Sequence, residues 1–164
     1  MSRNARTADR DLKAKILELL DEHRIATVAT TRPDGWPQAT MVGYVHNDLD
    51  IYFSVGRNSQ KLANIEHDPR VSIAIGHDGP AAIRGLSMAA KVEEVRDFDE
   101  IAQLNAWISE RYPGLKVFAP RETLCAVMRA RPTVVSVIDL AKGPGRPELV
   151  EVVSETAVYR AAGS

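Results

Sequence analysis

Apolar residues near the N-terminus recur at helical spacing and predict an amphipathic helix. This helix is expected to begin at Asp9 or Asp11 and to end near Glu22, while the polar residues 1–8 are expected to be disordered. Its apolar stripe consists of Leu12, Ile16, Leu19 and Leu20. Because these side chains share one face, we expect that face to pack on a sheet.

The next segment alternates apolar and polar positions and predicts three strands joined by tight turns. β-Branched residues favour a strand over residues 25–31, and the Asp-Gly pair that follows is a strong hairpin signal. Strands over 38–45 and 49–54 come next, with a turn at 46–48 between them. Such short connections predict an antiparallel meander.

A short helix and several further elements complete the pattern. Asn58 or Ser59 is expected to cap the short helix, which ends before Pro69. Asp97 is expected to cap a longer helix that ends near Arg111, with Glu100 completing a capping box. The apolar side of this longer helix is expected to include Phe98, Ile101, Leu104, Ala106, Trp107 and Ile108.

The second half of the chain also predicts four strands. Gly85 indicates either a bulge or a close approach of two backbones. Pro132 is expected to separate the last two strands, because proline cannot donate to a ladder. The four strands are expected over residues 70–75, 81–95, 124–128 and 133–140.

Together these elements predict a mainly β fold, an antiparallel barrel of six to seven strands with flanking helices. Short turns favour a closed barrel, because closure removes exposed sheet edges. The chain has 164 residues, no internal repeat and no long linker, which predicts a single domain over residues 1–164.

Composition and charge narrow the function classes. A formal net charge of −1 argues against a nucleic-acid partner. No apolar segment approaches the ~20 residues of a membrane span, so no membrane partner is expected. The single cysteine, Cys125, lies in an apolar run and is expected to be a buried, inert thiol in a reducing compartment. We therefore expect a cytoplasmic protein.

The usual catalytic motifs are absent from the sequence. The four histidines are isolated from one another, so no metal site is expected. Residues 54–70 instead place cations and hydroxyl groups beside a helix N-terminus, which favours a bound phosphate. An ordinary capped surface helix with solvated charges is the alternative. The strand at 38–45 could offer main-chain hydrogen bonds to a flat ring, with Met41 and Tyr44 near its plane.

These residues resemble a known family. The relevant runs are ATVATTRPDGWPQATMVGYV and LDIYFSVGRNSQKLANIEHDPRVSIAI. They are similar to the FMN-binding split barrels related to pyridoxamine 5′-phosphate oxidase, and the likeness covers roughly residues 10–140. The resemblance implies an antiparallel split barrel that forms a homodimer, with FMN at the subunit interface.

The resemblance also implies the residues that hold the FMN phosphate. Gln60 and Lys61 match the basic pair of the family, with one basic residue replaced here. Ser59 lies beside this pair. We expect Arg57 to compensate for the missing charge.

Two further segments match positions that contact the flavin. Phe53 and Ser54 correspond to a strand-end pair that touches FMN. Thr40, Met41 and Val42 correspond to the strand against the flavin ring, and Thr40 stands where many relatives carry an arginine.

The substrate segments depart from the family pattern. Val45 replaces a lysine of true pyridoxamine phosphate oxidases, and the C-terminal tail lacks their arginine–histidine motif. The expected function is therefore an FMN-dependent oxidoreductase acting on another small substrate. The alternatives are a deazaflavin F420-dependent reductase and a non-catalytic flavin- or haem-binding protein. The sequence does not identify a catalytic residue.

Overall fold

The computed structural model describes residues 3–78, 83–114, 124–139, 148–151 and 160–161. The helices are α1 (Arg3–Glu22), α2 (Gln60–His67) and α3 (Phe98–Arg111). The strands are β1 (Ile25–Thr31), β2 (Pro37–Asn47), β3 (Asp50–Gly56), β4 (Arg70–Asp78), β5 (Ile83–Glu94), β6 (Cys125–Asp139), β7 (Glu148–Glu151) and β8 (Arg160–Ala161). No helix in these ranges is long and apolar enough to cross a membrane.

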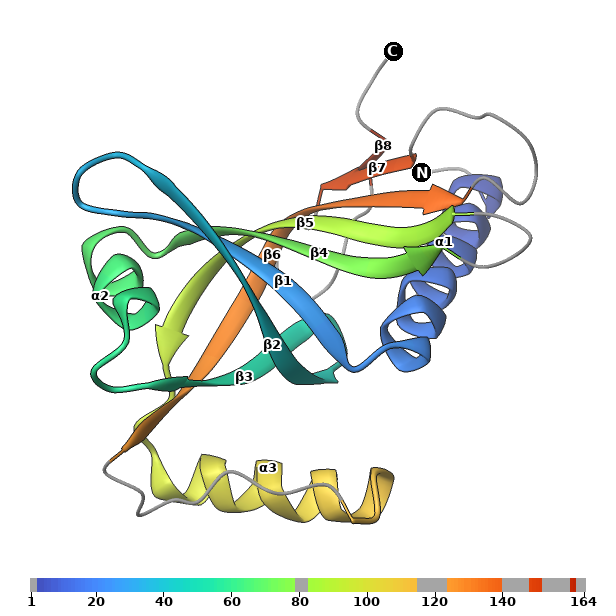
Figure 1. Cartoon of the computed structure of the whole chain (residues 1–164). Coiled ribbons are helices and arrows are strands. Elements are labelled where there is room, and N and C mark those ends of the chain that lie inside the picture. Colours follow the sequence, from blue (N-terminus) through green and yellow to red (C-terminus); the bar gives the residue numbers. More distant parts are fainter. Residues whose placement is uncertain (1–2, 79–82, 115–123, 140–147, 152–159, 162–164) are drawn as a thin grey trace.

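Six antiparallel strands close into a barrel, which confirms the expected fold class (Figure 1). Their order is β3-β2-β1-β4-β5-β6, and a pairing between β3 and β6 closes the ring. Along one edge of β6, residues 125–130 pair with β3, whereas residues 134–137 pair with β7. The barrel is therefore closed along only the first part of this strand.

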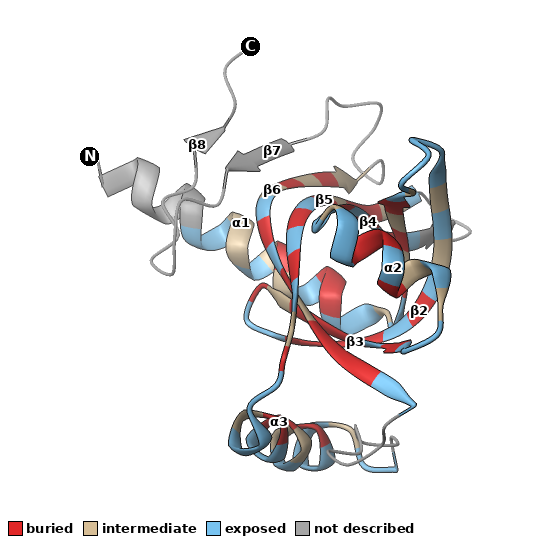
Figure 2. Cartoon of the chain, turned by 90° about the vertical axis from the view of Figure 1, so that its left-hand side faces the viewer, coloured by how far each residue is buried: buried red, intermediate tan, exposed pale blue. Residues whose placement is uncertain are grey.

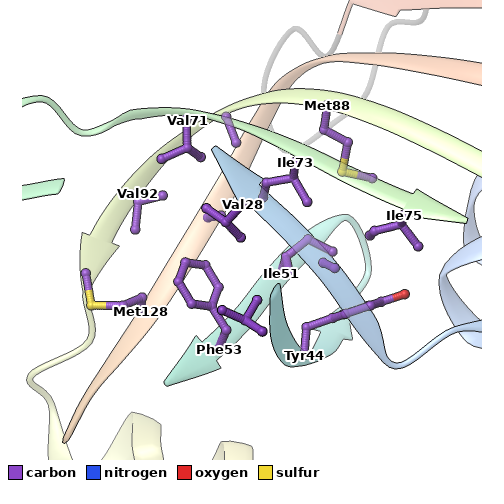
Figure 3. Close-up of a cluster of buried hydrophobic side chains, with 14 of the residues drawn as sticks. Val28, Tyr44, Ile51, Phe53, Val71, Ile73, Ile75, Met88, Val92 and Met128 are labelled. Atoms are coloured by element: carbon purple, nitrogen blue, oxygen red, sulfur yellow. The ribbon is translucent and has the colours of Figure 1, made fainter. Parts of the chain in front are cut away.

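Alternate residues of each strand fill the barrel with apolar side chains (Figure 3). Phe53, Ile73 and Met88 lie in this core and are at most 1% exposed. The predicted stripe of α1 packs on the same core, because Ile16, Leu19 and Leu20 are fully buried there. The helix begins at Arg3, earlier than expected.

The third helix packs on the outside of the barrel (Figure 2). A second apolar cluster joins Ile101, Leu104 and Ile108 of α3 to side chains such as Tyr52 and Val127.

The prediction for this helix was wrong at three positions. Phe98 is 64% exposed and Ala106 is also exposed, so neither belongs to the core. Asp97 caps the helix as predicted, but Glu100 accepts from Arg129 of β6. The carboxylate of Glu100 therefore joins α3 to the barrel.

The expected break at Pro132 is also wrong, because β6 is one continuous strand. The register shifts between Ala89 and Ala90, where Ala89 pairs with Val134 and Ala90 pairs with Pro132. This bulge leaves one extra residue, Thr133, in β6 and lets the ladder pass the proline. At Gly85, the expected close approach is confirmed and the bulge is not.

Cys125 is exposed at the start of β6, which corrects the expectation of a buried thiol. Its strand partner is Gly56, the last residue of β3. The apolar run around Cys125 in the sequence therefore marks the strand that follows it and not the burial of the thiol itself.

Candidate cofactor site

The strands β2 and β3 separate where the candidate site begins. Their pairing runs from Asn47–Asp50 to Tyr44–Phe53 and does not continue beyond it. Past this point, among the described residues, β2 pairs with β1 and β3 pairs with β6. Figure 1 shows α2 at this end of the barrel, between the β1–β2 hairpin and the end of β3.

One edge of β2 consequently has main-chain groups without a ladder partner in the described chain. The amide of Tyr44 donates to Arg24 O at 3.0 Å, on the β1 side. Since main-chain groups alternate in direction along a strand, the amide and the carbonyl of Met41 point away from β1, beyond the last β2–β3 pair. A planar ring with donors and acceptors along its edge could bond to them.

The predicted ring segment lies on both faces of β2. Thr40 and Val42 face the interior, and Val42 is buried. Met41 points outward and is 76% exposed. The hydroxyl Oγ1 of Thr40 is buried without a hydrogen-bond partner in the described structure, whereas buried polar groups are normally paired with protein or ordered water.

The predicted strand-end pair, Phe53 and Ser54, also lies on both faces of its strand, β3. The Phe53 side chain is fully buried in the barrel core, whereas Ser54 is exposed on the outer face. A ligand on the outside of the barrel would therefore meet the Ser54 side chain and only the main chain of Phe53.

At the start of α2, Ser59 is the cap and its side chain accepts from the Leu62 amide at 3.2 Å. Gln60 is committed to another contact, because its Nε2 donates to Asn64 Oδ1 at 2.8 Å. The two cations of this segment, Arg57 and Lys61, differ in whether they have a carboxylate partner. Arg57 pairs with Glu94 at 2.8 Å, whereas Lys61 has no carboxylate within ion-pair distance among the described residues.

Lys61 is half-buried, and burial lowers its pKa. A desolvated ammonium group without a counter-ion is stabilised by any anion that reaches it. Together with the unpaired hydroxyl of Thr40 and the open edge of β2, this makes the residues present a fit for a flat cofactor that carries a phosphate. The structure thus brings the Lys61 segment and the β2 segment to one end of the barrel.

Sequence reasoning missed Asn64, which is completely buried in α2. Its Nδ2 donates to Thr30 Oγ1 and to Gln38 Oε1, both at 2.9 Å. The signal that could have found it is a polar residue between the apolar positions Leu62 and Ile65, on the face that must be buried.

A second feature of this region is the outer face of the sheet. Several residues that point outward from four neighbouring strands and from the second half of β6 are uncharged, whereas Arg70 of β4 and Lys91 of β5, which are paired in the ladder, are charged and exposed. We call this set the outer sheet face: Thr27, Ala29, Ala39, Met41, Ser72, Ala74, Ser87 and Ser136. A shallow groove of about 350 Å³ crosses it, lined in part by Thr27, Ala74 and Ser87.

Comparison with known proteins identifies the family. The chain matches the pyridoxamine 5′-phosphate oxidase family over residues 12–139 and belongs to that family. It is 34% identical over 68 residues to general stress protein 26 of Bacillus subtilis (strain 168), a match that covers 42% of this chain and 48% of that protein. The chain thus matches about half the length of this curated relative.

Solved structures share the fold. HutZ, the haem storage protein of Vibrio cholerae, is 23% identical with a TM-score of 0.59, over 73% of this chain and 88% of that chain. An F420 reductase is 27% identical with a TM-score of 0.56, over 73% and 94% of the two chains. Solved structures with this fold thus include a haem storage protein and an F420 reductase.

Proposed function

We propose that this protein is an FMN-binding flavoprotein that acts as an oxidoreductase on a small substrate. The observation that carries the proposal is the half-buried Lys61, which has no counter-ion among the described residues and lies at the end of the barrel where the edge of β2 is open. Bound FMN would supply hydride or electron transfer, which the side chains of this chain do not themselves provide.

In this proposal the start of α2 holds the phosphate. Lys61 gives a charge-assisted bond, and the N-terminal amides of the helix add the favourable end of its dipole. Ser54 and Ser59 lie in the same segment as hydroxyl donors. Because Glu94 balances the charge of Arg57, the arginine would attract a phosphate less strongly than Lys61 does.

The ring would lie along β2. The main-chain groups of Met41 would bond to its polar edge, and the exposed Met41 side chain would cover part of its plane. The packed barrel interior behind Val42 would exclude water from that side. A substrate would approach the ring face that this chain leaves open.

We also propose that the active form is a homodimer that pairs through the outer sheet face. The eight residues that define this face are uncharged and Met41 within it is 76% exposed, while the charged Arg70 and Lys91 lie farther along β4 and β5. A broad uncharged surface of this kind is typical of an interface between subunits. Since Met41 belongs both to this face and to the proposed ring site, the partner subunit would lie next to the cofactor.

A deazaflavin F420-dependent reaction is the second candidate, favoured by the 27% identity to an F420 reductase. Haem is a weaker candidate for the described residues. Both ring nitrogens of the buried His46 are engaged, by Asp48 O and Asp21 Oδ1 at 2.9 Å each. His67 is exposed at the last turn of α2.

The test is a titration of the purified protein with FMN, F420 and haem, followed by visible absorbance. We expect saturable FMN binding and a shift of the flavin spectrum. Tighter binding of F420 than of FMN would move the assignment to the second candidate. If the protein binds none of the three cofactors, the proposal is contradicted. Stable FMN binding without turnover of any substrate would indicate a carrier or a sensor.

A further inference from the structure

The side chain of Asn64 makes three of its four possible hydrogen bonds inside the protein. Both protons of its amide nitrogen are donated, one to Thr30 Oγ1 and one to Gln38 Oε1, each at 2.9 Å. Its oxygen accepts from Gln60 Nε2 at 2.8 Å. A buried amide with three bonds of this geometry is held in one orientation, because each lost bond would leave a polar group unsatisfied.

The two acceptors belong to one rung of the β1–β2 ladder. Thr30 and Gln38 are directly opposite each other in the register. The Thr30 hydroxyl also contacts Gln38 O, at 3.4 Å. Asn64 therefore fixes the rotation and the height of α2 against β1 and β2 together.

This anchor lies between the two halves of the proposed site. Lys61 precedes Asn64 by three residues, so the two share one side of the helix. Gln38 precedes Thr40 by two residues, so both point to the same face of β2. A helix turns by about 100° and rises about 1.5 Å per residue, so a small slip of α2 would displace the Lys61 ammonium from β2.

We propose that Asn64 is the positioning residue that sets where the Lys61 ammonium lies relative to β2, and that Gln38 and Gln60 complete its amide network. Its relevance to cofactor binding rests on the proposed function, whereas the anchoring of α2 does not. Gln60 acts here through Asn64 and not through direct contact with the phosphate. The position of the buried Asn64 amide thus determines whether one cofactor can place its phosphate at Lys61 and its ring along β2 at the same time.

The experiment compares Asn64→Leu, Gln38→Leu and the double variant with the unchanged protein. Leucine has the same number and branching of side-chain heavy atoms as asparagine and cannot form the bonds. Ile65→Val is the matched control, because it removes buried volume from the same helix and leaves the amide network intact. Gln38→Leu keeps the test informative if Asn64→Leu does not fold.

Two ligands separate positioning from general destabilisation. Riboflavin has the flavin ring but no phosphate, so it does not depend on Lys61. We expect Asn64→Leu to lower FMN affinity roughly three- to tenfold, within the limit set by Lys61→Ala, and to leave riboflavin affinity unchanged. Gln38→Leu should show the same selective loss, and the double variant should lose no more than either single one.

Hydrogen exchange of residues 60–67 in the cofactor-free protein gives the second readout. Faster exchange in Asn64→Leu than in Ile65→Val supports the anchor. Equal exchange in these two variants, equal losses for FMN and riboflavin, or additive losses in the double variant would overturn it. If the unchanged protein binds no flavin, the proposed function fails. The hydrogen-exchange result then decides by itself whether Asn64 holds α2 against β1 and β2.

Discussion

Lys61 illustrates how a single residue can indicate a ligand. Its ammonium is half-buried, and burial lowers its pKa because the charged form loses water without gaining a carboxylate partner in the described structure. By contrast, Arg57, four residues earlier, has its charge balanced by Glu94. The two cations look equivalent in the sequence. In the described structure, however, Arg57 is paired with a carboxylate and Lys61 is not.

Replacing this residue should therefore weaken the cofactor. A charge-assisted bond is worth about 1.5–3 kcal/mol, so we expect Lys61→Ala to lower FMN affinity roughly tenfold or more in a fluorescence titration. Lys91→Ala is the control, because Lys91 is exposed on β5. Equal affinities of the two variants would contradict the assigned position of the phosphate.

At the scale of elements, the contact between β4 and β5 depends on two glycines that pair directly. A Cβ atom on Gly85 would lie 2.4 Å from Ile75 O, and one on Gly76 would lie 2.5 Å from Arg84 O. Gly76 also has φ +148°, which other residues rarely adopt. The two backbones therefore approach more closely than side chains would allow.

We expect Gly85→Ala to destabilise the barrel by about 1–3 kcal/mol, as is usual for overpacking, and urea unfolding would measure this loss. Gly43→Ala is the matched control in β2, because the nearest atom to its added Cβ is Arg24 O at 3.9 Å. Similar midpoints for both variants would show that β4 and β5 can move apart without cost.

At the scale of the whole molecule, the barrel presents an uncharged face next to the proposed ring site. Ala74 lies within this outer sheet face and is exposed. Neighbouring strands bring the face together from segments that are distant in the sequence, because β4 pairs with β1 and β5. The quaternary structure and cofactor binding should therefore be linked.

We expect Ala74→Glu to convert a dimer into monomers in sedimentation experiments and to weaken FMN binding at the same time. Two buried carboxylates without partners would oppose association. Ala102→Glu on the exposed side of α3 should leave the dimer intact. A monomeric unchanged protein, or a dimeric Ala74→Glu variant, would argue against this interface.

Local patterns in the sequence were sufficient for most elements. Strand alternation, the Asp-Gly turn and the caps at Ser59 and Asp97 involve neighbours along the chain, and the structure has them where expected. The errors arose where a distant segment changes the outcome. Pro132 does not end a strand because the register shifts at the neighbouring Thr133 and Pro132 itself still pairs with Ala90. Phe98 is exposed because α3 packs through other positions.

By itself, the sequence determined a mainly β fold and placed the candidate phosphate segment at the start of the short helix. Only the tertiary structure decided which partners the side chains of that segment bind. Barrel closure brings Glu94 to Arg57, and the packing of α2 brings Asn64 to Thr30 and Gln38. The reason is physical: periodicity and caps depend on residues a few positions apart, whereas a buried bond or ion pair depends on which distant strands become neighbours.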